Sequence, residues 1–143
     1  MTVSADLIAH VALRCACLLT QLASAGRPVD RSGGGTVTEA YPAASLKVWG
    51  LPHSGYKRPK DTRLLGEIVD SITATAQWLD FGDALDVCRR RHDAMDAVIA
   101  ALTARAAALG RTLRPRTATE AAAAETEGWI AVPNADSLRG LAG

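Results

Sequence analysis

Two aspartates, Asp93 and Asp96, lie three residues apart in the segment 92–97, which opens a strongly helical stretch. Side chains three apart on a helix are neighbours on one face. These carboxylates are therefore expected to project together near the helix N-terminus, where the dipole favours negative charge. A cation relieves the repulsion of two such acids, and Mg²⁺ accepts oxygen ligands in this arrangement. The alternative is that both acids only cap and charge the first helical turn.

A third acid, Glu39, lies in the β-branched segment Thr36–Tyr41, which predicts a strand. Alternation places Glu39 on one face with Val37 and Tyr41. We therefore expect it to be ion-paired, metal-bound or at the exposed end of a sheet. If this strand packs beside the helix of Asp93 and Asp96, three carboxylates converge. Such a cluster suits metal-assisted phosphoryl chemistry, in which two divalent ions activate water and stabilise the leaving oxygen.

The alanines of the same helix bear on whether the three acids converge. Their spacing leaves a face of small residues that can pack closely against a sheet and bring Asp93 and Asp96 near the end of the strand. The residues concerned are Ala97, Ala100, Ala101 and Ala104.

Two other segments carry features that could contact phosphate. Lys57, Arg58 and Lys60 form a basic cluster in a proline- and glycine-containing stretch, which predicts an exposed loop. This loop either contacts phosphates or is simply solvated. The run Gly33–Gly35 lacks the Gly-Lys-Ser/Thr and the following helix of a phosphate-binding loop, so it predicts a flexible turn.

Cysteine and histidine offer weaker alternatives. Cys88 and His92 are spaced for a Cys–His hydrolase site, but no orienting partner is recognisable, and His92 is expected to lie at the helix entry rather than to carry protons. Cys15 and Cys17 are two apart on a predicted helix, so their side chains point apart and cannot easily share a metal. An odd cysteine count argues against a secreted disulfide scaffold.

The amino-acid composition limits the kind of fold that can position these residues. The chain has 143 residues and a formal net charge of +1, with 48% hydrophobic, 22% charged and only 4% aromatic residues. These values predict one helix-rich domain over 1–143, because sheets prefer β-branched and aromatic residues. A neutral balance excludes any global attraction to nucleic acid or membranes.

The predicted elements follow from apolar periodicity and from cap signals. The first helix carries His10, Arg14 and Gln21 within its apolar stretch and no signal-peptide pattern, which predicts a soluble, cytoplasmic protein without a membrane span. We expect a first helix over Leu7–Ala25 with Ser4 as its N-cap and a short second helix over Ala43–Trp49. A third helix follows its N-cap, Asp61, and carries an apolar stripe over Leu64–Leu79, and a short helical piece begins at Asp83. The remaining elements are a helix over His92–Leu109, a helix after the Thr117/Glu120 capping box, a strand over Gly128–Val132 and a frayed tail over 134–143.

Several segments resemble, in the same order, motifs of an uncharacterised bacterial family of predicted nucleases with an RNase-H-like fold (domain of unknown function 429). The resemblance implies a site for Mg²⁺ or Mn²⁺ acting on nucleic acid. In it, Glu39 matches the glutamate at the end of the fourth strand, Asp96 the aspartate of the C-terminal helix and Asp93 the acid one turn before. The segments are 38–46 (TEAYPAASL), 49–53 (WGLPH), 55–57 (GYK), 92–97 (HDAMDA) and 127–130 (EGWI).

One family feature has no counterpart in the chain. Family members usually begin with a strand hairpin that carries a first catalytic aspartate, and Asp6 is helical and does not take that role. We therefore expect a helix-rich α/β chain that forms the C-terminal half of an RNase-H-like (ribonuclease H/resolvase) domain without its N-terminal hairpin. The strand at 36–41 would then expose an unpaired edge. We expect the chain alone to have weak or no activity. A misplaced start codon, a decayed gene, a separate N-terminal subunit and self-association are the alternative explanations of the missing hairpin. The alternative function is a non-enzymatic protein-interaction module.

Overall fold

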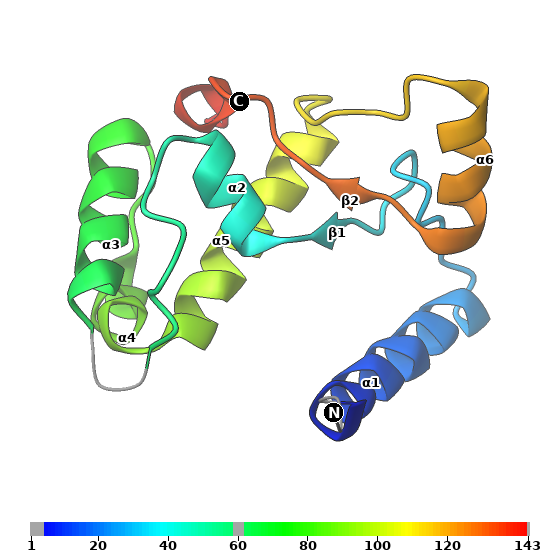
Figure 1. Cartoon of the computed structure of the whole chain (residues 1–143), viewed down its shortest axis with the longest axis horizontal. Helices are drawn as coiled ribbons and strands as arrows, with labels where there is room; N and C mark the ends of the chain where they lie inside the picture. The colour runs from blue at the N-terminus through cyan, green and yellow to red at the C-terminus, as the bar shows by residue number, and fades with distance from the viewer. Residues whose placement is uncertain (1–4, 59–61, 143) are drawn as a thin grey trace.

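The computed structural model describes residues 5–58 and 62–142. Three residues with expected cap or phosphate roles, Ser4, Lys60 and Asp61, lie outside these ranges. The described elements (Figure 1) are α1 (Ala5–Ser24), β1 (Glu39–Ala40), α2 (Pro42–Val48), α3 (Arg63–Thr75), the 3-10 turn η1 (Gly82–Ala84), α4 (Leu85–Arg90), α5 (His92–Ala108), α6 (Ala118–Glu127), β2 (Ile130–Ala131) and the 3-10 turn η2 (Ser137–Gly140). Within these ranges, six helices and one small two-stranded sheet confirm a helix-rich chain with a minor sheet.

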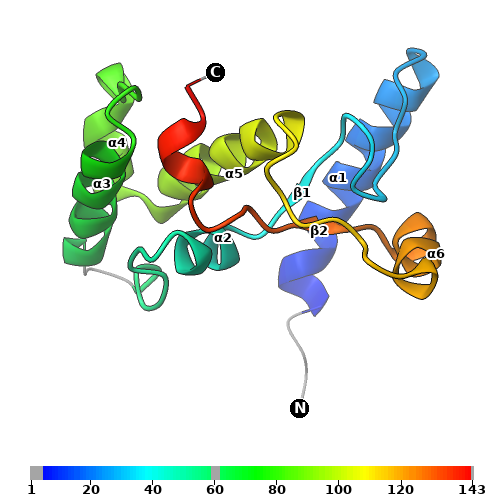
Figure 2. The ribbon, with the colours of Figure 1, turned by 90° about the horizontal axis from the view of Figure 1, so that it is seen from above.

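The core lies between α2, α3, α4 and α5, with α3 and α4 at one end of the molecule and α1 and α6 at the other (Figures 1 and 2). α3 buries its apolar stripe as its spacing predicts, although the helix ends at Thr75, before the stripe does. The fully or nearly fully buried side chains of α3 are Leu65, Ile68, Val69 and Ile72.

α5 corrects the expectation about its small-residue face. Ala97, Ala101 and Ala104 are exposed, whereas larger side chains such as Met95 and Ile99 are buried. Alanines occur on all sides of α5, so the sequence pattern alone does not specify which face of the helix is buried. The rotation that buries the larger apolar side chains removes more apolar area from water.

The sheet is smaller than the sequence predicts. β1 pairs with β2 in parallel, with Glu39 opposite Ile130 and Ala40 opposite Ala131. The expected strand over 36–41 thus shortens to two residues, because Tyr41 already precedes the proline that opens α2. Within the described residues the second edge of β1 pairs with no strand. Two short strands are not stable alone, so α5, which contacts both of them, supports the sheet.

The C-terminal segment, expected to be a frayed tail, packs against the core instead. Leu138 and Leu141 are buried, and the Trp49 indole donates to Ser137 Oγ at 3.0 Å. Arg105 and Arg111 donate to carbonyl oxygens of the last residues, from Gly140 to Ala142. Leu138 and Leu141, in a segment without clear apolar periodicity, therefore form part of the core.

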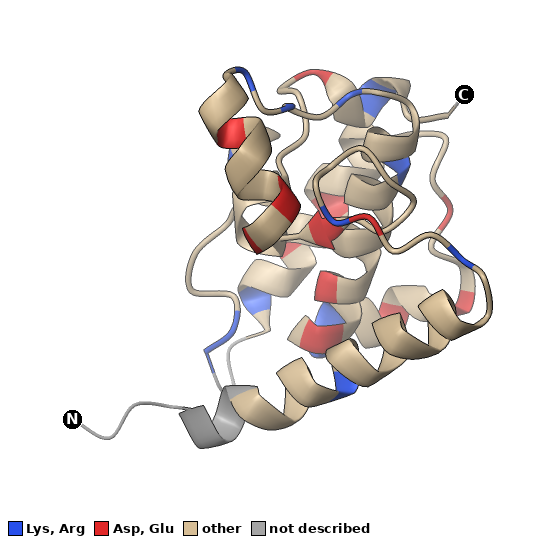
Figure 3. Ribbon diagram, turned by 90° about the vertical axis from the view of Figure 1, so that its right-hand side faces the viewer, with Lys and Arg blue, Asp and Glu red and all other residues tan. Residues whose placement is uncertain are grey.

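α1 stands apart from the other elements. Its side chains from 9 to 24 are exposed, apart from a half-buried Leu19, and it packs extensively against no other helix or strand of the described chain. Figure 3 shows it along one edge of the molecule. From residue 9 to residue 24 its sequence has one charged residue, Arg14. None of the helices in the described ranges has the length and apolarity to cross a membrane.

Candidate functional site

The two elements that carry the acidic residues are in contact. β1, which begins at Glu39, packs on α5, which carries Asp93 and Asp96 in its first two turns. The local reasons are clear: Pro42 ends the strand and starts α2, and Arg91 in extended conformation precedes α5. The strand and the helix of the predicted acidic cluster therefore lie together.

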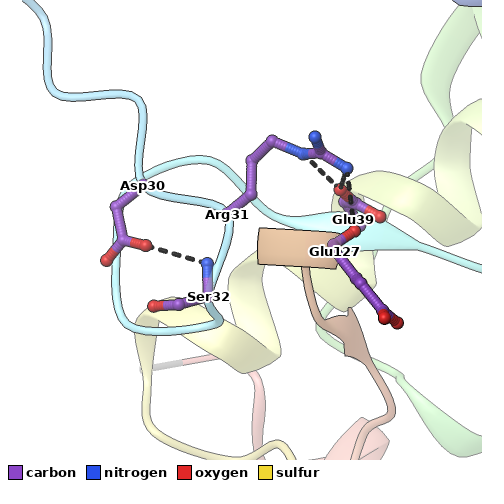
Figure 4. A network of polar contacts seen from close by, with 5 residues as sticks. All are labelled: Asp30, Arg31, Ser32, Glu39 and Glu127. Carbon is purple, nitrogen blue, oxygen red and sulfur yellow. Dashed lines mark hydrogen bonds and ion pairs between the residues drawn. The ribbon is translucent and has the colours of Figure 1, made fainter. Parts of the chain in front are cut away.

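Glu39 is held by an arginine that precedes it in the chain. The Arg31 guanidinium forms an ion pair with the half-buried Glu39 carboxylate and also donates to the carbonyl oxygen of Glu127 at 3.3 Å (Figure 4). The backbone of Arg31 accepts a hydrogen bond from Trp129 N at 2.8 Å. Of the three environments expected for Glu39, the structure therefore has the ion pair.

The turn before Arg31 and the glycine after α6 shape this contact. Asp30 accepts a hydrogen bond from Ser32 N at 2.8 Å, and the bonds from Ser32 lower the pKa of Asp30 (Figure 4). Gly128 has φ +89°, and a Cβ there would lie 2.6 Å from Glu39 Oε1. Only glycine therefore allows the end of α6 to approach the ion pair so closely.

Asp96 has two polar partners from the loop before α3. Tyr56 Oη donates to Oδ1 at 2.7 Å, and Lys57 Nζ lies 2.6 Å from Oδ2. The Lys57 ammonium also lies 5.6 Å from the centre of the Tyr56 ring. Burial, and then the bond to Asp96, raises the pKa of Tyr56, so this phenol is a donor. Both oxygens of Asp96 are thus engaged.

Asp93 has a different environment from Asp96. Its side chain is 76% exposed, against 20% for Asp96, and its Oδ1 lies 3.1 Å from Nδ1 of the neighbouring His92. In residues 5–58 and 62–142, no three histidine, cysteine, aspartate or glutamate side chains are grouped so as to hold a metal ion. The acids therefore sit on contacting elements, but Glu39 and Asp96 are engaged by separate polar partners, and Asp93 is exposed.

The basic residues and the cysteine that the sequence singles out do not join the acids in one site. Lys57 pairs with Asp96, Arg58 is exposed, and Lys60 lies outside the described residues. Cys88 is buried, and burial raises the pKa of its thiol, which disfavours the thiolate that a Cys–His site with His92 would need.

Sequence reasoning missed the partners of the acids. Arg31 reaches Glu39 over eight residues, and Tyr56 reaches Asp96 over forty. For Lys57 the sequence does carry a signal, since it belongs to the basic cluster, but its pairing with an acid does not follow from spacing. Nothing local marks Arg31 or Tyr56 as a partner.

A groove adjoins the Arg31–Glu39 pair. It has a volume of about 570 Å³ and separates α1 from the backbone of residues 37–40. Its α1 wall carries small and apolar side chains at helical spacing, and its other wall is formed by Arg31 and residues 37–40, which include β1. The α1 side chains that line it are Ala12, Cys15, Ala16 and Leu19.

Comparisons with known proteins give one finding. No curated protein and no solved structure matches the chain. The model of one family, described as "Protein of unknown function (DUF429)", matches residues 3–120. This range covers well over half of the sequence and includes Glu39, Asp93 and Asp96, so the chain belongs to the DUF429 family.

Proposed function

We propose that the chain is a cytoplasmic phosphodiesterase of the RNase H type, with a partial RNase-H-like fold, and that it acts on nucleic acid with Mg²⁺ or Mn²⁺. Its acidic residues would be Glu39, Asp93 and Asp96. The observation that supports this proposal is the packing of β1 on α5, because it brings the strand of Glu39 against the helix of both aspartates. Acids on a strand and an adjacent helix are the type of donors that divalent metals use in phosphoryl chemistry.

The described arrangement does not fit a metal ion as it stands. Arg31 neutralises Glu39, while Lys57 and Tyr56 engage both oxygens of Asp96. A divalent ion would have to displace the Lys57 ammonium before Asp96 could become a ligand. We therefore derive no catalytic step through a metal and expect the chain alone to hydrolyse nucleic acid weakly or not at all.

A calorimetric titration with MgCl₂ and MnCl₂ tests the ligands. We expect weak binding by the native chain and its loss in Asp96→Asn, which keeps an acceptor for Tyr56 and so preserves the fold. Asp86→Asn, at an exposed acid of α4, is the matched control and should bind as the native chain does. An absence of binding, or binding that is unchanged in Asp96→Asn, overturns the proposed site.

Cleavage assays test the expected weak activity. Single- and double-stranded DNA and RNA are incubated with the chain and either metal, and little or no product is expected. Vigorous metal-dependent cleavage that disappears in Glu39→Gln would contradict the expectation of a nearly inactive chain, while it would support the site.

Nucleic-acid contacts are proposed for Lys57, Arg58 and Lys60. Phosphate contacts release counterions, so affinity should fall steeply with salt concentration. Arg58→Ala is the informative variant, because Arg58 is exposed and is not the partner of Asp96. Affinity that does not change with salt would exclude this role.

A second candidate function is an interaction subunit without enzymatic activity. The observation that favours it is α1, whose apolar side chains are exposed while the core forms without them. The dye ANS, which binds exposed apolar surface, should bind the dilute chain and lose that binding once a partner covers α1. A dilute monomer that binds no dye would contradict an interaction role for this helix.

A further inference from the structure

α1 has two apolar faces. One lines the groove beside β1, with Ala12, Ala16 and Leu19, and Cys15 lies at its border with the second face. The other includes Val11, Leu18 and Leu22, all of which are exposed. A helix that packs against the body of its own chain needs only the first face. The second face is therefore the one that remains to be explained.

The spacing of this second face describes a helix–helix seam. Val11, Cys15, Leu18 and Leu22 recur at intervals of four, three and four residues, and all four side chains are exposed. Apolar residues at alternating intervals of three and four form the a and d positions of a coiled-coil contact. We call these four residues the α1 stripe. It extends over three turns, about 17 Å along the helix.

The spacing of the α1 stripe is the same when it is counted from either end. Two copies of the helix placed antiparallel therefore match layer by layer, with Val11 of one copy against Leu22 of the other and Cys15 against Leu18. A two-fold symmetric contact needs one surface that is complementary to itself. A palindromic stripe meets this requirement without any residue from a different protein.

The flanks of the α1 stripe favour the same arrangement. Arg14 and Gln21 lie on one flank, and Ala12 and Leu19 lie on the other. In an antiparallel pair each flank meets the same flank of the second helix. Arg14 then lies beside the Gln21 amide and donates to it. Ala12 and Leu19, at the border with the groove, lie beside the same residues of the second helix. In a parallel pair Arg14 would instead face Leu19, which would desolvate its charge without a partner.

We propose that α1 is a self-association surface whose occupant is a second copy of this chain, paired antiparallel through the α1 stripe. The inference rests on the interaction role proposed above and is independent of the metal chemistry. Arg14 is the one charged residue from 9 to 24, so a strongly charged partner would find no complementary charges there. The contact is short, so the dimer should form reversibly and depend on concentration.

Sedimentation velocity over a range of chain concentrations tests the dimer. The native chain should shift from monomer to dimer as its concentration rises, and Leu18→Glu should abolish the shift. Leu13→Glu is a matched control, because Leu13 lies on the same helix with 63% exposure against 58% for Leu18, but outside the α1 stripe. Far-UV circular dichroism of both variants shows whether α1 stays helical.

Disulfide cross-linking tests the orientation. Val11→Cys and Leu22→Cys chains, oxidised as a mixture, should join through positions 11 and 22, as identified by peptide mass. Val11→Cys oxidised alone should not join through position 11. A parallel pair would give the opposite result.

Three results overturn the proposal: a native chain that is monomeric at every concentration, equal loss of dimer in Leu13→Glu and Leu18→Glu, or linkage of position 11 to itself. A monomer that still binds ANS through α1 refutes self-association alone. A monomer that binds no dye refutes the interaction role as well.

Discussion

Lys57 Nζ lies 2.6 Å from Oδ2 of Asp96, and the chain thereby neutralises the more buried of its two helix acids with its own cation. The Tyr56 hydroxyl engages the other oxygen at 2.7 Å. A carboxylate held in this way is satisfied without a metal. The relationship between Lys57 and Asp96 therefore determines how readily the proposed site takes up a divalent ion.

Removal of the lysine should make Asp96 available. We expect Lys57→Met to raise the affinity for Mg²⁺ or Mn²⁺ by up to about fivefold, because an ion pair whose lysine is half exposed is worth roughly 1 kcal/mol or less. Isothermal titration measures the change. Lys47→Met, which removes an exposed lysine from α2, is the control and should have no effect. An unchanged affinity in Lys57→Met would show that the ammonium does not compete with the metal.

Gly128→Ala should destabilise the protein. Its positive φ strains an alanine, and the new Cβ would meet the Glu39 carboxylate at 2.6 Å. Gly110→Ala is the matched control, because Gly110 has φ +68° but no atom within 4 Å of the added Cβ. Urea unfolding should give a loss of about 1 kcal/mol for Gly110→Ala from the backbone alone and a clearly larger loss for Gly128→Ala. Equal losses would mean that the Arg31–Glu39 pair moves aside without cost.

Leu138→Ala should show that the C-terminal turn belongs to the core. Leu138 is buried, and truncation of a buried leucine costs roughly 2–5 kcal/mol of unfolding free energy. Arg139→Ala changes the next, exposed residue and should cost much less. The two variants are compared by thermal or urea unfolding. A similar, small effect of both would indicate a frayed tail.

The cysteines should differ in reactivity. In the dilute chain Cys15 and Cys17 are exposed and should react with Ellman's reagent quickly, whereas buried Cys88 should react only after unfolding. Burial raises the pKa of the Cys88 thiol, so the unfolded chain loses this proton first as the pH rises. Stability should therefore decline between the ordinary thiol pKa and the raised one, and Cys88→Ala should remove that part of the decline. Three equally fast thiols would contradict the burial of Cys88.

The sequence by itself determined those features that depend on near neighbours. The Thr117–Glu120 capping box, the helix that starts at His92 and the break at Pro42 all involve residues within four positions of one another, and the structure confirms them. The family was also recognisable from the order of its motifs, although the matched range ends at 120, before the segment 127–130.

Only the tertiary structure decided how the acids and the core faces are used. Asp96 meets a lysine and a tyrosine about forty residues away, and Glu39 meets Arg31 across a turn whose course no local pattern specifies. Packing likewise decided which face of α5 is buried, because alanines occur on all sides of that helix. Short-range preferences act along the chain, whereas these contacts depend on which distant surfaces meet. The same reason explains α1: its apolar pattern predicts a helix that must pack against something, and the fold leaves that surface exposed.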